Sequence, residues 1–282
     1  MTTHGGEQIE KTVRGWQGGY APVNGLNLYY EIHGSGQPLL LLHGGFGLTG
    51  MFGEVLPQLA AGRQVIAVDL QGHGRTADLD RPLRLELMAE DIAALIRHLG
   101  IEQADLMGYS LGGAVALRTA IQHPEVIRKL VVVSTPYKRA AWYPDMVAAM
   151  EQMSAATAPF LLETPMYHAY AAVAPDPEHF PVLVDKMGEL LRQDYDWSGE
   201  VAALTAPTML VFGDADSLPP REAAEFFALL GGGQRDGSWD RSGMTMHRLA
   251  ILPGTTHYDI FASPALPAVV TPFLDAPMPE TK

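Results

Sequence analysis

The segment Gly108-Tyr109-Ser110-Leu111-Gly112 places a serine where one local pattern changes abruptly into another. Asp105–Met107 before it is typical of the end of a short strand, and Gly113–Ala120 after it is typical of a helix. A serine at so sharp a strand-to-helix turn leaves space only for small residues two positions away on either side. We therefore expect a strained turn that holds the hydroxyl of this serine above a sheet edge, beside the free N–H groups of a helix start.

A serine hydroxyl is a weak nucleophile unless a base takes its proton and a third group orients that base. Two downstream runs, Pro207–Phe212 and Arg248–Leu252, are typical of buried strands. The first is followed by a loop that contains Asp216, and the second by a loop that contains His257. Because ligands of open α/β sheets bind at the carboxyl ends of the strands, Ser110, an acid and a histidine are predicted to meet at that edge.

An earlier strand-like run, Pro38–Leu42, ends in the glycine-rich stretch His43–Gly47. A loop of this kind can bring a backbone N–H close to a developing oxyanion, and the residue after the nucleophile, Leu111, can supply a second one. Gly45 is the predicted donor in the loop, and Phe46 is the alternative if the loop is shifted by one residue.

These four separately placed motifs resemble those of the α/β-hydrolase superfamily, of the serine esterase type with a helical cap, from about Tyr20 to about Asp275. The resemblance implies an α/β fold with a mostly parallel central sheet, helices on both faces and a helical cap insertion. It also favours Asp216 over Asp214 as the acid. In similar sequences the acid ends a Gly-x-x-Asp run and a proline follows four residues later, here Pro220.

The remainder of the core alternates between strand and helix patterns, as βα units do. Tyr20–Ile32 predicts two strands joined at an Asn-Gly pair, the strongest short indication of a hairpin. Gln64–Asp69 and Lys129–Ser134 predict further strands. Apolar residues recur at helical spacing over Leu85–Leu99, and Gly100 is placed to end that helix.

Between Thr135 and about Glu200 the alternation is lost. Patterns rich in alanine and methionine predict helices over Pro144–Met153, Pro159–Ala174 and Pro177–Arg192. Similar proteins carry a helical cap in this place, between the strand after the serine turn and the strand before the acid. Three parts are therefore expected: residues 1–135 as the first part of the core, 136–200 as the cap and 201–282 as the second part of the core.

The predicted substrate pocket is apolar, and both core and cap contribute to it. Its predicted members are Phe46, Tyr109, Trp142, Met150, Phe160 and Tyr167. Residues 231–244 form a long polar stretch before the last strand, which we interpret as a surface loop.

Of the ten histidines, His257 follows a late strand in a Pro-Gly-Thr-Thr-His context and is the predicted base. His43 is expected to hold the glycine-rich loop in shape, and the resemblance gives His73 and Asp69 structural roles. No group of His, Asp and Glu has a metal-ligand spacing such as H-E-x-x-H, so we predict neither a metal nor a dissociable cofactor.

The composition restricts the classes of molecule that we expect this protein to bind. The 282 residues include no cysteine, which excludes disulfides and a thiol nucleophile and is consistent with the cytoplasm. A net charge of −13 disfavours nucleic acid and anionic membrane surfaces. No apolar run is long enough to cross a bilayer, and Met1–Lys11 lacks the order of a secretory signal. We expect a cytoplasmic monomer or homodimer whose partner is a small-molecule ester substrate.

Motifs and resemblance together predict a serine carboxylic-ester hydrolase that acts on neutral apolar esters through an acyl-enzyme intermediate. Weaker resemblances leave an acyl homoserine lactonase or a pyrethroid-type esterase as alternatives. Carbon–carbon hydrolases, lyases, cofactor-free peroxidases and small-molecule receptors of this fold carry the same triad, and motifs do not separate them. Relatives that open epoxides or displace halides carry a carboxylate nucleophile, and Ser110 argues against that chemistry.

Overall fold

A single mixed sheet forms the centre of the protein, which we describe from a computed structural model for residues 10–11 and 16–279. Within these residues its nine strands follow the order β1-β2-β3-β5-β4-β6-β7-β8-β9. The strands are β1 (Glu10–Lys11), β2 (Trp16–Val23), β3 (Leu26–His33), β4 (Pro38–Leu42), β5 (Gln64–Val68), β6 (Ala104–Tyr109), β7 (Ile127–Val133), β8 (Thr208–Ala215) and β9 (Arg248–Thr256). Pairs from β1 to β5 along this order are antiparallel and all later pairs are parallel, so the parallel strands end at one edge.

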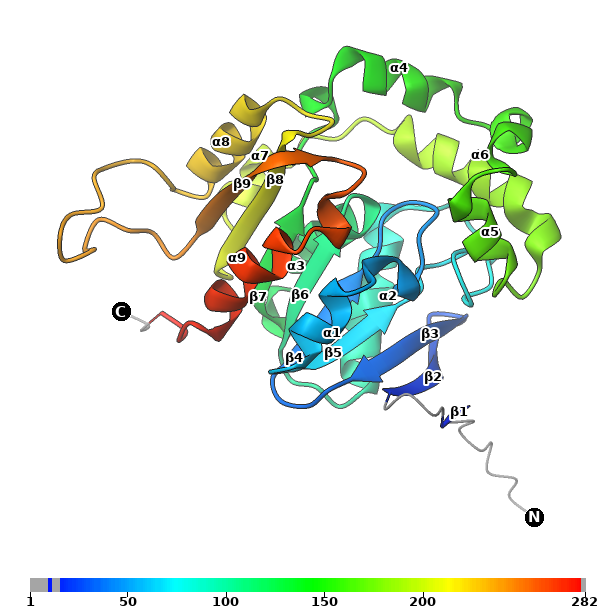
Figure 1. Cartoon of the computed structure of the whole chain (residues 1–282), viewed down its shortest axis with the longest axis horizontal. Coiled ribbons are helices and arrows are strands. Elements are labelled where there is room, and N and C mark those ends of the chain that lie inside the picture. Colours follow the sequence, from blue (N-terminus) through cyan, green and yellow to red (C-terminus); the bar gives the residue numbers. More distant parts are fainter. Residues whose placement is uncertain (1–9, 12–15, 280–282) are drawn as a thin grey trace.

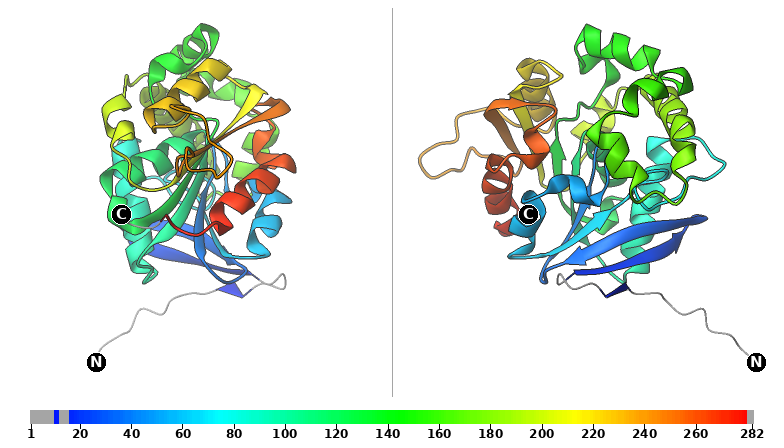
Figure 2. Two further views of the ribbon diagram at one scale, coloured as in Figure 1. Left: turned by 90° about the vertical axis from the view of Figure 1, so that its left-hand side faces the viewer. Right: turned by 45° about the vertical axis from the view of Figure 1, so that its right-hand side comes forward.

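Helices cover both faces of this sheet, as Figures 1 and 2 show. They are α1 (Val55–Ala60), α2 (Leu85–His98), α3 (Leu111–Gln122), α4 (Pro144–Gln152), α5 (Pro165–Ala171), α6 (Phe180–Leu191), α7 (Ser198–Ala202), α8 (Pro220–Leu229) and α9 (Ala265–Asp275). Buried residues of α1 and α9 belong to the hydrophobic cluster on one face, and those of α2, α3 and α8 to the cluster on the other. The predicted α/β fold with helices on both faces is confirmed.

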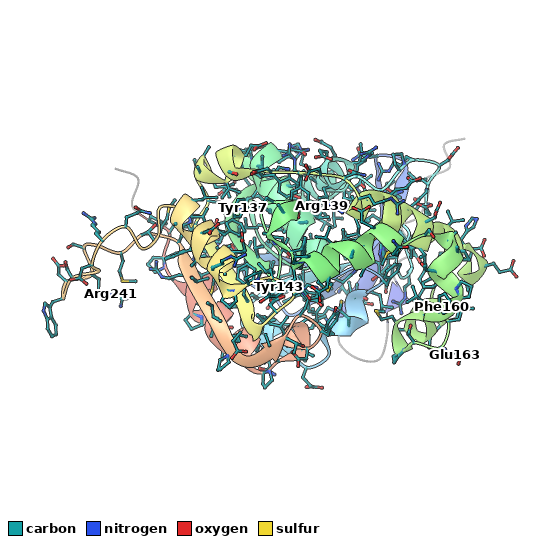
Figure 3. The ribbon with its side chains drawn as sticks, turned by 90° about the horizontal axis from the view of Figure 1, so that it is seen from above. Tyr137, Arg139, Tyr143, Phe160, Glu163 and Arg241 are labelled. Carbon is teal, nitrogen blue, oxygen red and sulfur yellow. The ribbon has the colours of Figure 1, made fainter. Side chains whose placement is uncertain are left out.

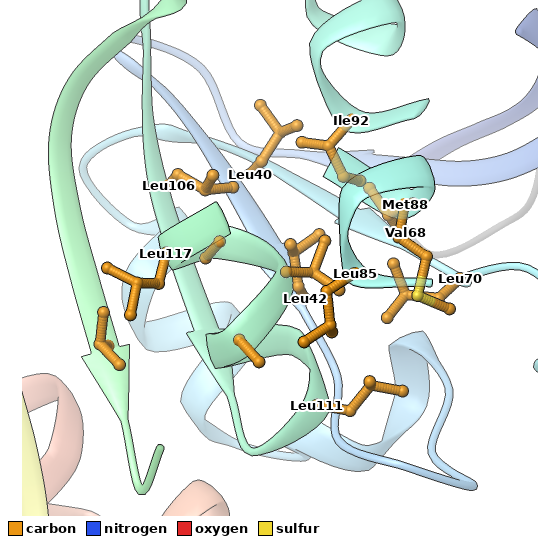
Figure 4. Close-up of a cluster of buried hydrophobic side chains, with 14 of the residues drawn as sticks. Leu40, Leu42, Val68, Leu70, Leu85, Met88, Ile92, Leu106, Leu111 and Leu117 are labelled. Carbon is orange, nitrogen blue, oxygen red and sulfur yellow. The ribbon is translucent and has the colours of Figure 1, made fainter. Parts of the chain in front are cut away.

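The strand β4 shows why the sequence pattern was apolar at every position. Leu40 and Leu42 pack into the cluster beneath α2 and α3 (Figure 4), whereas Leu39 and Leu41 point into the cluster beneath α1 and α9. Successive side chains of a strand point to opposite faces, so a strand covered on both sides has no solvent-facing position. All four leucines are fully buried.

Two local predictions are confirmed in detail. The hairpin of β2 and β3 turns at Asn24 and Gly25, whose φ angles of 47° and 85° give the backbone twist that joins antiparallel strands. The helix α2 buries its apolar stripe, and the chain leaves it through Gly100 at a φ of 68°. Both features are determined by residues that are neighbours in the sequence, which is why they could be predicted from it.

The helix predicted over Pro159–Ala174 is wrong. The structure has a 3-10 helix over Ala155–Leu161 and a separate α5 that begins at Pro165. Thr164 caps α5, because its side chain accepts a hydrogen bond from the N–H of Tyr167 at 3.3 Å. Proline lacks an N–H and clashes with the preceding turn, so a helix can start at this Thr-Pro pair but cannot pass through it.

The segments between β7 and β8 lie over the carboxyl edge of the sheet, where α4, α5 and α6 stand above the strand ends (Figures 1 and 2). Lys186 of α6 ties them to the core, since its Nζ donates to the Asp78 carboxylate at 2.5 Å and to the carbonyls of Leu79 and Arg81. The short α7, at Ser198–Ala202, spans the predicted end of the cap. The division at residues 136 and 200 stays a prediction.

The stretch 231–244 is a largely exposed loop that projects from the body between α8 and β9, with Trp239 fully exposed (Figures 1 and 3). In the part of the chain that the structure describes, no helix combines the length and apolarity needed to cross a bilayer. The N-terminal segment Met1–Lys11 is predicted to lack a secretory signal. Most of it, residues 1–9, lies outside the described residues.

A buried lysine holds the end of α9 against the sheet. Lys129 in β7 is 1% exposed, and its Nζ donates to the carbonyls of Phe273 and Leu274 at 2.9 Å each and also to that of Ala276. The last carbonyls of a helix have no partner within the helix and carry partial negative charge. Lys129 therefore satisfies groups that would otherwise be buried without a donor.

We predict that Lys129→Met lowers the free energy of unfolding by about 2 kcal/mol, because buried carbonyls lose their donor. Arg97→Met is the matched control. Arg97 is half-exposed and pairs with Glu125 at 2.8 Å on the surface, so its loss should cost less than about 1 kcal/mol. Urea denaturation followed by circular dichroism measures both. Equal losses in the two variants would contradict the role given to Lys129.

Candidate active site

Ser110 occupies a strained turn between β6 and α3. Its φ of 52° and ψ of −117° lie in a region that side chains rarely adopt, at a cost of about 1–3 kcal/mol. The neighbouring glycines leave no space for a side chain. A Cβ on Gly108 would stand 2.0 Å from the Gly112 carbonyl oxygen, and one on Gly112 would stand 2.4 Å from the Leu42 carbonyl oxygen. The small residues of the motif are therefore a packing requirement of the turn.

The structure brings Ser110, His257 and Asp216 into one line of hydrogen bonds. His257 follows β9, and its Nε2 lies 3.1 Å from the Oγ of Ser110. Its Nδ1 lies 2.9 Å from Oδ1 of Asp216. This is the arrangement in which an imidazole can take a proton from the hydroxyl while the carboxylate fixes its orientation.

Asp216 is buried, and its two oxygens accept four hydrogen bonds. Oδ1 accepts from the N–H of Ser217 at 2.7 Å besides His257, and Oδ2 accepts from the hydroxyl of Ser134 at 2.5 Å and the N–H of Gly213 at 3.1 Å. Burial by itself raises the pKa of this carboxyl, but His257 and the other donors outweigh it and hold the pKa below its usual value. The carboxylate is therefore kept ionised.

The rival acid, Asp214, lies elsewhere. It is exposed, and its Oδ1 accepts from the N–H of Thr255 at 3.2 Å, which fastens the carboxyl end of β8 to β9. No hydrogen bond joins its carboxylate to His257 in the described part of the chain. Geometry thus separates two aspartates that stand only two residues apart.

The predicted oxyanion donors are backbone N–H groups of the turn at Ser110 and of the glycine-rich loop. Leu111 is the first residue of α3, and neither its N–H nor that of Gly45 has an acceptor among the described residues. The loop runs alongside the nucleophile, since a Cβ on Gly44 would lie 3.4 Å from the Cβ of Ser110. The N–H of Phe46, the alternative donor, likewise has no acceptor among the described residues, so the choice between Gly45 and Phe46 stays a prediction. Phe46 has a φ of 58°, and its ring lies 5.9 Å from that of Phe180.

Buried imidazoles support the glycine-rich loop. His43 donates through Nδ1 to the Gly44 carbonyl at 2.7 Å and accepts through Nε2 from the N–H of Leu70 at 3.0 Å. Burial lowers its pKa to about 3, so it stays neutral and keeps one donor and one acceptor. His73 is likewise buried and donates to the Gln71 carbonyl at 2.8 Å, and burial lowers its pKa to about 4.

Asp69 ties the same loop to the sheet. Its carboxylate accepts from the N–H of Thr49 at 2.7 Å and from the N–H of Arg75 at 2.8 Å. Burial raises its pKa to about 6 against the effect of these donors. Asp69 thus joins the loops that follow β4 and β5.

Among the residues predicted to line a pocket, Trp142 stands beside the base, with its ring 5.6 Å from that of His257. The rings of Phe46 and Tyr167 lie 5.9 Å and 4.9 Å from that of Phe180, so the loop after β4 and the segment between β7 and β8 meet there. Met150 is buried in α4. Whether these four side chains contact a substrate stays a prediction.

Two members of that set are wrong. Phe160 is 82% exposed and points away from the molecule at the outer end of the helical segments between β7 and β8 (Figure 3). The 3-10 helix that carries it places it on the outer side. Tyr109 lies beneath His257, because its hydroxyl donates to the His257 carbonyl at 2.6 Å and its ring packs against Phe261 at 5.0 Å. It supports the base from the core side.

Three side chains at this site were missed. Met187 of α6 reaches the loop, since a Cβ on Gly45 would stand 2.9 Å from its Cε. Ser134 and Thr135, just after β7, contact Asp216 and the Ser110 carbonyl respectively. The two hydroxyl residues could have been found by the rule that located the acid, because they too are polar residues at a strand's carboxyl end. No local pattern indicates Met187.

Across the described residues, no three His, Asp or Glu side chains gather in an arrangement that could hold a metal ion.

The sequence profile of the α/β hydrolase fold family matches residues 37–236, so the chain belongs to this family. RutD of Azorhizobium caulinodans, named as a candidate carbamate hydrolase, is 30% identical over 219 residues, which are 71% of this chain and 82% of RutD.

The 2-hydroxymuconate semialdehyde hydrolase of Pseudomonas sp. strain CF600 is 40% identical over 106 residues, 36% of this chain and 38% of that protein. The chain thus spans well under half of that relative's length. Among solved structures, a thermophilic esterase from Thermogutta terrifontis superposes with a TM-score of 0.72 at 20% identity, over 92% of this chain and 98% of the esterase. This likeness shows the shared fold.

We predict a pH dependence of stability from His73. Its pKa is about 4 in the folded protein, against 6.5 for an unperturbed imidazole. Below pH 6.5 the unfolded chain binds a proton that the folded protein excludes, so His73 lowers the free energy of unfolding as the pH falls toward 4. In His73→Gln the slope of that free energy against pH should decrease by up to about 1.4 kcal/mol per pH unit.

Urea denaturation at several pH values measures the slope. His98→Gln is the control, because His98 is exposed near the end of α2. Its slope should equal that of the wild type. An unchanged slope in His73→Gln would show that the buried imidazole is protonated in the folded protein.

Proposed function

We propose that this protein is a serine hydrolase that cleaves neutral carboxylic esters through an acyl-enzyme intermediate. The observation that carries the proposal is the continuous hydrogen-bonded line from the Ser110 hydroxyl through His257 to the buried Asp216. A serine in a strained turn, a base within reach of its proton and an ionised acid behind that base are the parts that acyl transfer needs.

In the proposed first step, Nε2 of His257 takes the hydroxyl proton while Oγ of Ser110 bonds to the ester carbonyl carbon. The carbonyl oxygen becomes an oxyanion, and the N–H groups of Gly45 and Leu111 donate to it. The bond to the alkoxy oxygen then breaks, and His257 gives its proton to the leaving alcohol. In the second step His257 takes a proton from water, whose oxygen attacks the acyl-enzyme. The carboxylic acid leaves, and the serine regains its proton.

The apolar surroundings of the serine support neutral substrates. Trp142 stands beside His257, Phe46 belongs to the glycine-rich loop, and Met187 of α6 reaches Gly45 of that loop. None of these side chains carries a charge that could pair with a substrate carboxylate, and desolvating an unpaired carboxylate is costly. In this proposal residues 136–200 act as the cap and supply one wall of the acyl pocket.

Carbamate cleavage is the second candidate, and the similarity to RutD favours it. Attack on a carbamate carbonyl uses the same nucleophile, base and oxyanion donors. A panel of p-nitrophenyl esters of increasing chain length, lactones including an acyl homoserine lactone, a pyrethroid and an alkyl carbamate ranks these classes by kcat/KM. Turnover of none of them would overturn the hydrolase proposal.

We predict that Ser110→Ala and Asp216→Asn each lower kcat/KM for p-nitrophenyl butyrate by about 10⁴-fold, the first by loss of the nucleophile and the second by presenting the wrong imidazole tautomer. The matched control is Asp214→Asn, which should stay within about twofold of wild type, since its carboxylate accepts from the backbone of β9. Activity should be unchanged after exhaustive chelation. If Asp214→Asn were inactive and Asp216→Asn were active, the acid would be Asp214 and the assignment to Asp216 would be wrong.

We predict that Met187→Ala alters acyl specificity and that Phe160→Ala does not. Removing the thioether beside Gly45 opens space next to the oxyanion loop, so kcat/KM for octanoate relative to acetate esters should rise about tenfold. Phe160 is exposed, and the same ratio should change by less than about twofold in Phe160→Ala. An equal effect of the two changes would show that α6 does not shape the acyl site.

A further inference from the structure

Ser134 is held in an unusual position immediately after β7. This strand lies between β6, which leads to Ser110, and β8, which leads to Asp216. The N–H of Ser134 donates to the Val211 carbonyl of β8 at 2.9 Å. Its side chain is fully buried, and its φ is 51°. A residue with a side chain persists in this region only where its surroundings fix it, and such residues cluster at functional sites.

Within the described part of the chain, the Ser134 hydroxyl donates to Oδ2 of Asp216, at 2.5 Å, and to no other group. The N–H of Gly213 is the other donor to that oxygen, and Oδ1 accepts from Ser217 and His257. A carboxylate can rotate about its single bond unless both oxygens are held. With Oδ2 fixed by a side chain from a different strand, Oδ1 keeps its direction toward the imidazole.

The next residue acts at the other end of the site. The hydroxyl of Thr135 donates to the backbone carbonyl of Ser110 at 2.8 Å. Two consecutive hydroxyl residues after β7 therefore contact the turn of the nucleophile and the carboxylate of the acid. If Ser134 only filled a buried space, its hydroxyl could donate to any nearby acceptor, such as a backbone carbonyl of its own strand. Instead it donates to the Asp216 carboxylate.

We propose that Ser134 is a positioning residue, whose hydroxyl fixes the Asp216 carboxylate in the orientation that directs Oδ1 to Nδ1 of His257. The proposal rests on the hydrolase function proposed above. Ser134 touches neither substrate nor reacting atoms, and it acts through Asp216. It also helps to keep that carboxylate ionised, since a hydrogen bond to the charged form favours it.

The experiment compares Ser134→Ala and Ser134→Gly with Thr119→Val. Both substitutions of Ser134 remove the hydroxyl. Glycine also relieves the backbone strain, so Ser134→Gly should fold even if Ser134→Ala does not. Thr119 is the control, because its buried hydroxyl donates only to the Val115 carbonyl within α3. Both serine variants should lose about 10- to 100-fold in kcat with KM within about twofold, as expected for one hydrogen bond to a charged group. Thr119→Val should stay near wild type.

The pH–rate profile is a second readout. Loss of the donor raises the pKa of Asp216. When the pH is lowered, the variants should therefore lose activity at a higher pH than the wild type does. Among the described residues, the other titratable groups near this pair are Tyr109 from β6 and Tyr258 and Asp259 from the segment after β9. Burial and, to a smaller extent, the charge of Asp216 raise the pKa of Tyr109. These groups, and His257 itself, are unchanged in the variants. A shift of the profile is therefore assigned to the lost hydroxyl.

Proton NMR supplies a readout that needs no turnover. The Nδ1–H of His257 bonds to Asp216, and its downfield resonance should move in both serine variants and stay in place in Thr119→Val. If the wild type cleaves no ester, the function proposal fails while this resonance still tests Ser134. An unmoved resonance, a kcat loss no larger than that of the control, or full activity in Ser134→Gly would each overturn the positioning role.

Discussion

The turn at Ser110 is the constraint on which the rest of the site depends. A non-glycine residue at a φ of 52° is tolerated only because backbone packs against backbone on both sides, at Gly108 and Gly112. The strain fixes the hydroxyl above the sheet edge and leaves the N–H of Leu111, at the start of α3, without an acceptor among the described residues. One local geometry therefore places both the proposed nucleophile and a proposed oxyanion donor.

Parallel strands bring the other parts to the same edge. His257 follows β9, Asp216 follows β8, the glycine-rich loop follows β4, and Ser134 and Thr135 follow β7. Burial then sets the state of each group. His43 is kept neutral and can hold its loop by one donor and one acceptor, whereas four hydrogen bonds keep Asp216 ionised in spite of its burial. The same low-dielectric surroundings thus give opposite results, because the partners differ.

Short runs of residues determine the strands and the hairpin at Asn24, so these could be predicted from the sequence. The same holds for the positions of Ser110, Asp216 and His257. The segment between β7 and β8 was harder. Its helices have similar sequence patterns whether or not they reach the site, so the sequence placed Phe160 in a pocket that it faces away from and did not single out Met187. Tyr109 was misplaced for a related reason, since alternation in β6 does not say which face of the sheet meets the base.

Trapping of the covalent intermediate tests the account's central claim most directly. Wild-type protein is mixed with excess p-nitrophenyl butyrate, quenched in acid within milliseconds to seconds and examined by intact-protein and peptide mass spectrometry. The account predicts a butyryl adduct on the peptide that contains Ser110, formed with a burst of p-nitrophenol and absent from Ser110→Ala. Turnover with no adduct on that peptide, or an adduct on another residue that forms at the rate of turnover, would contradict it.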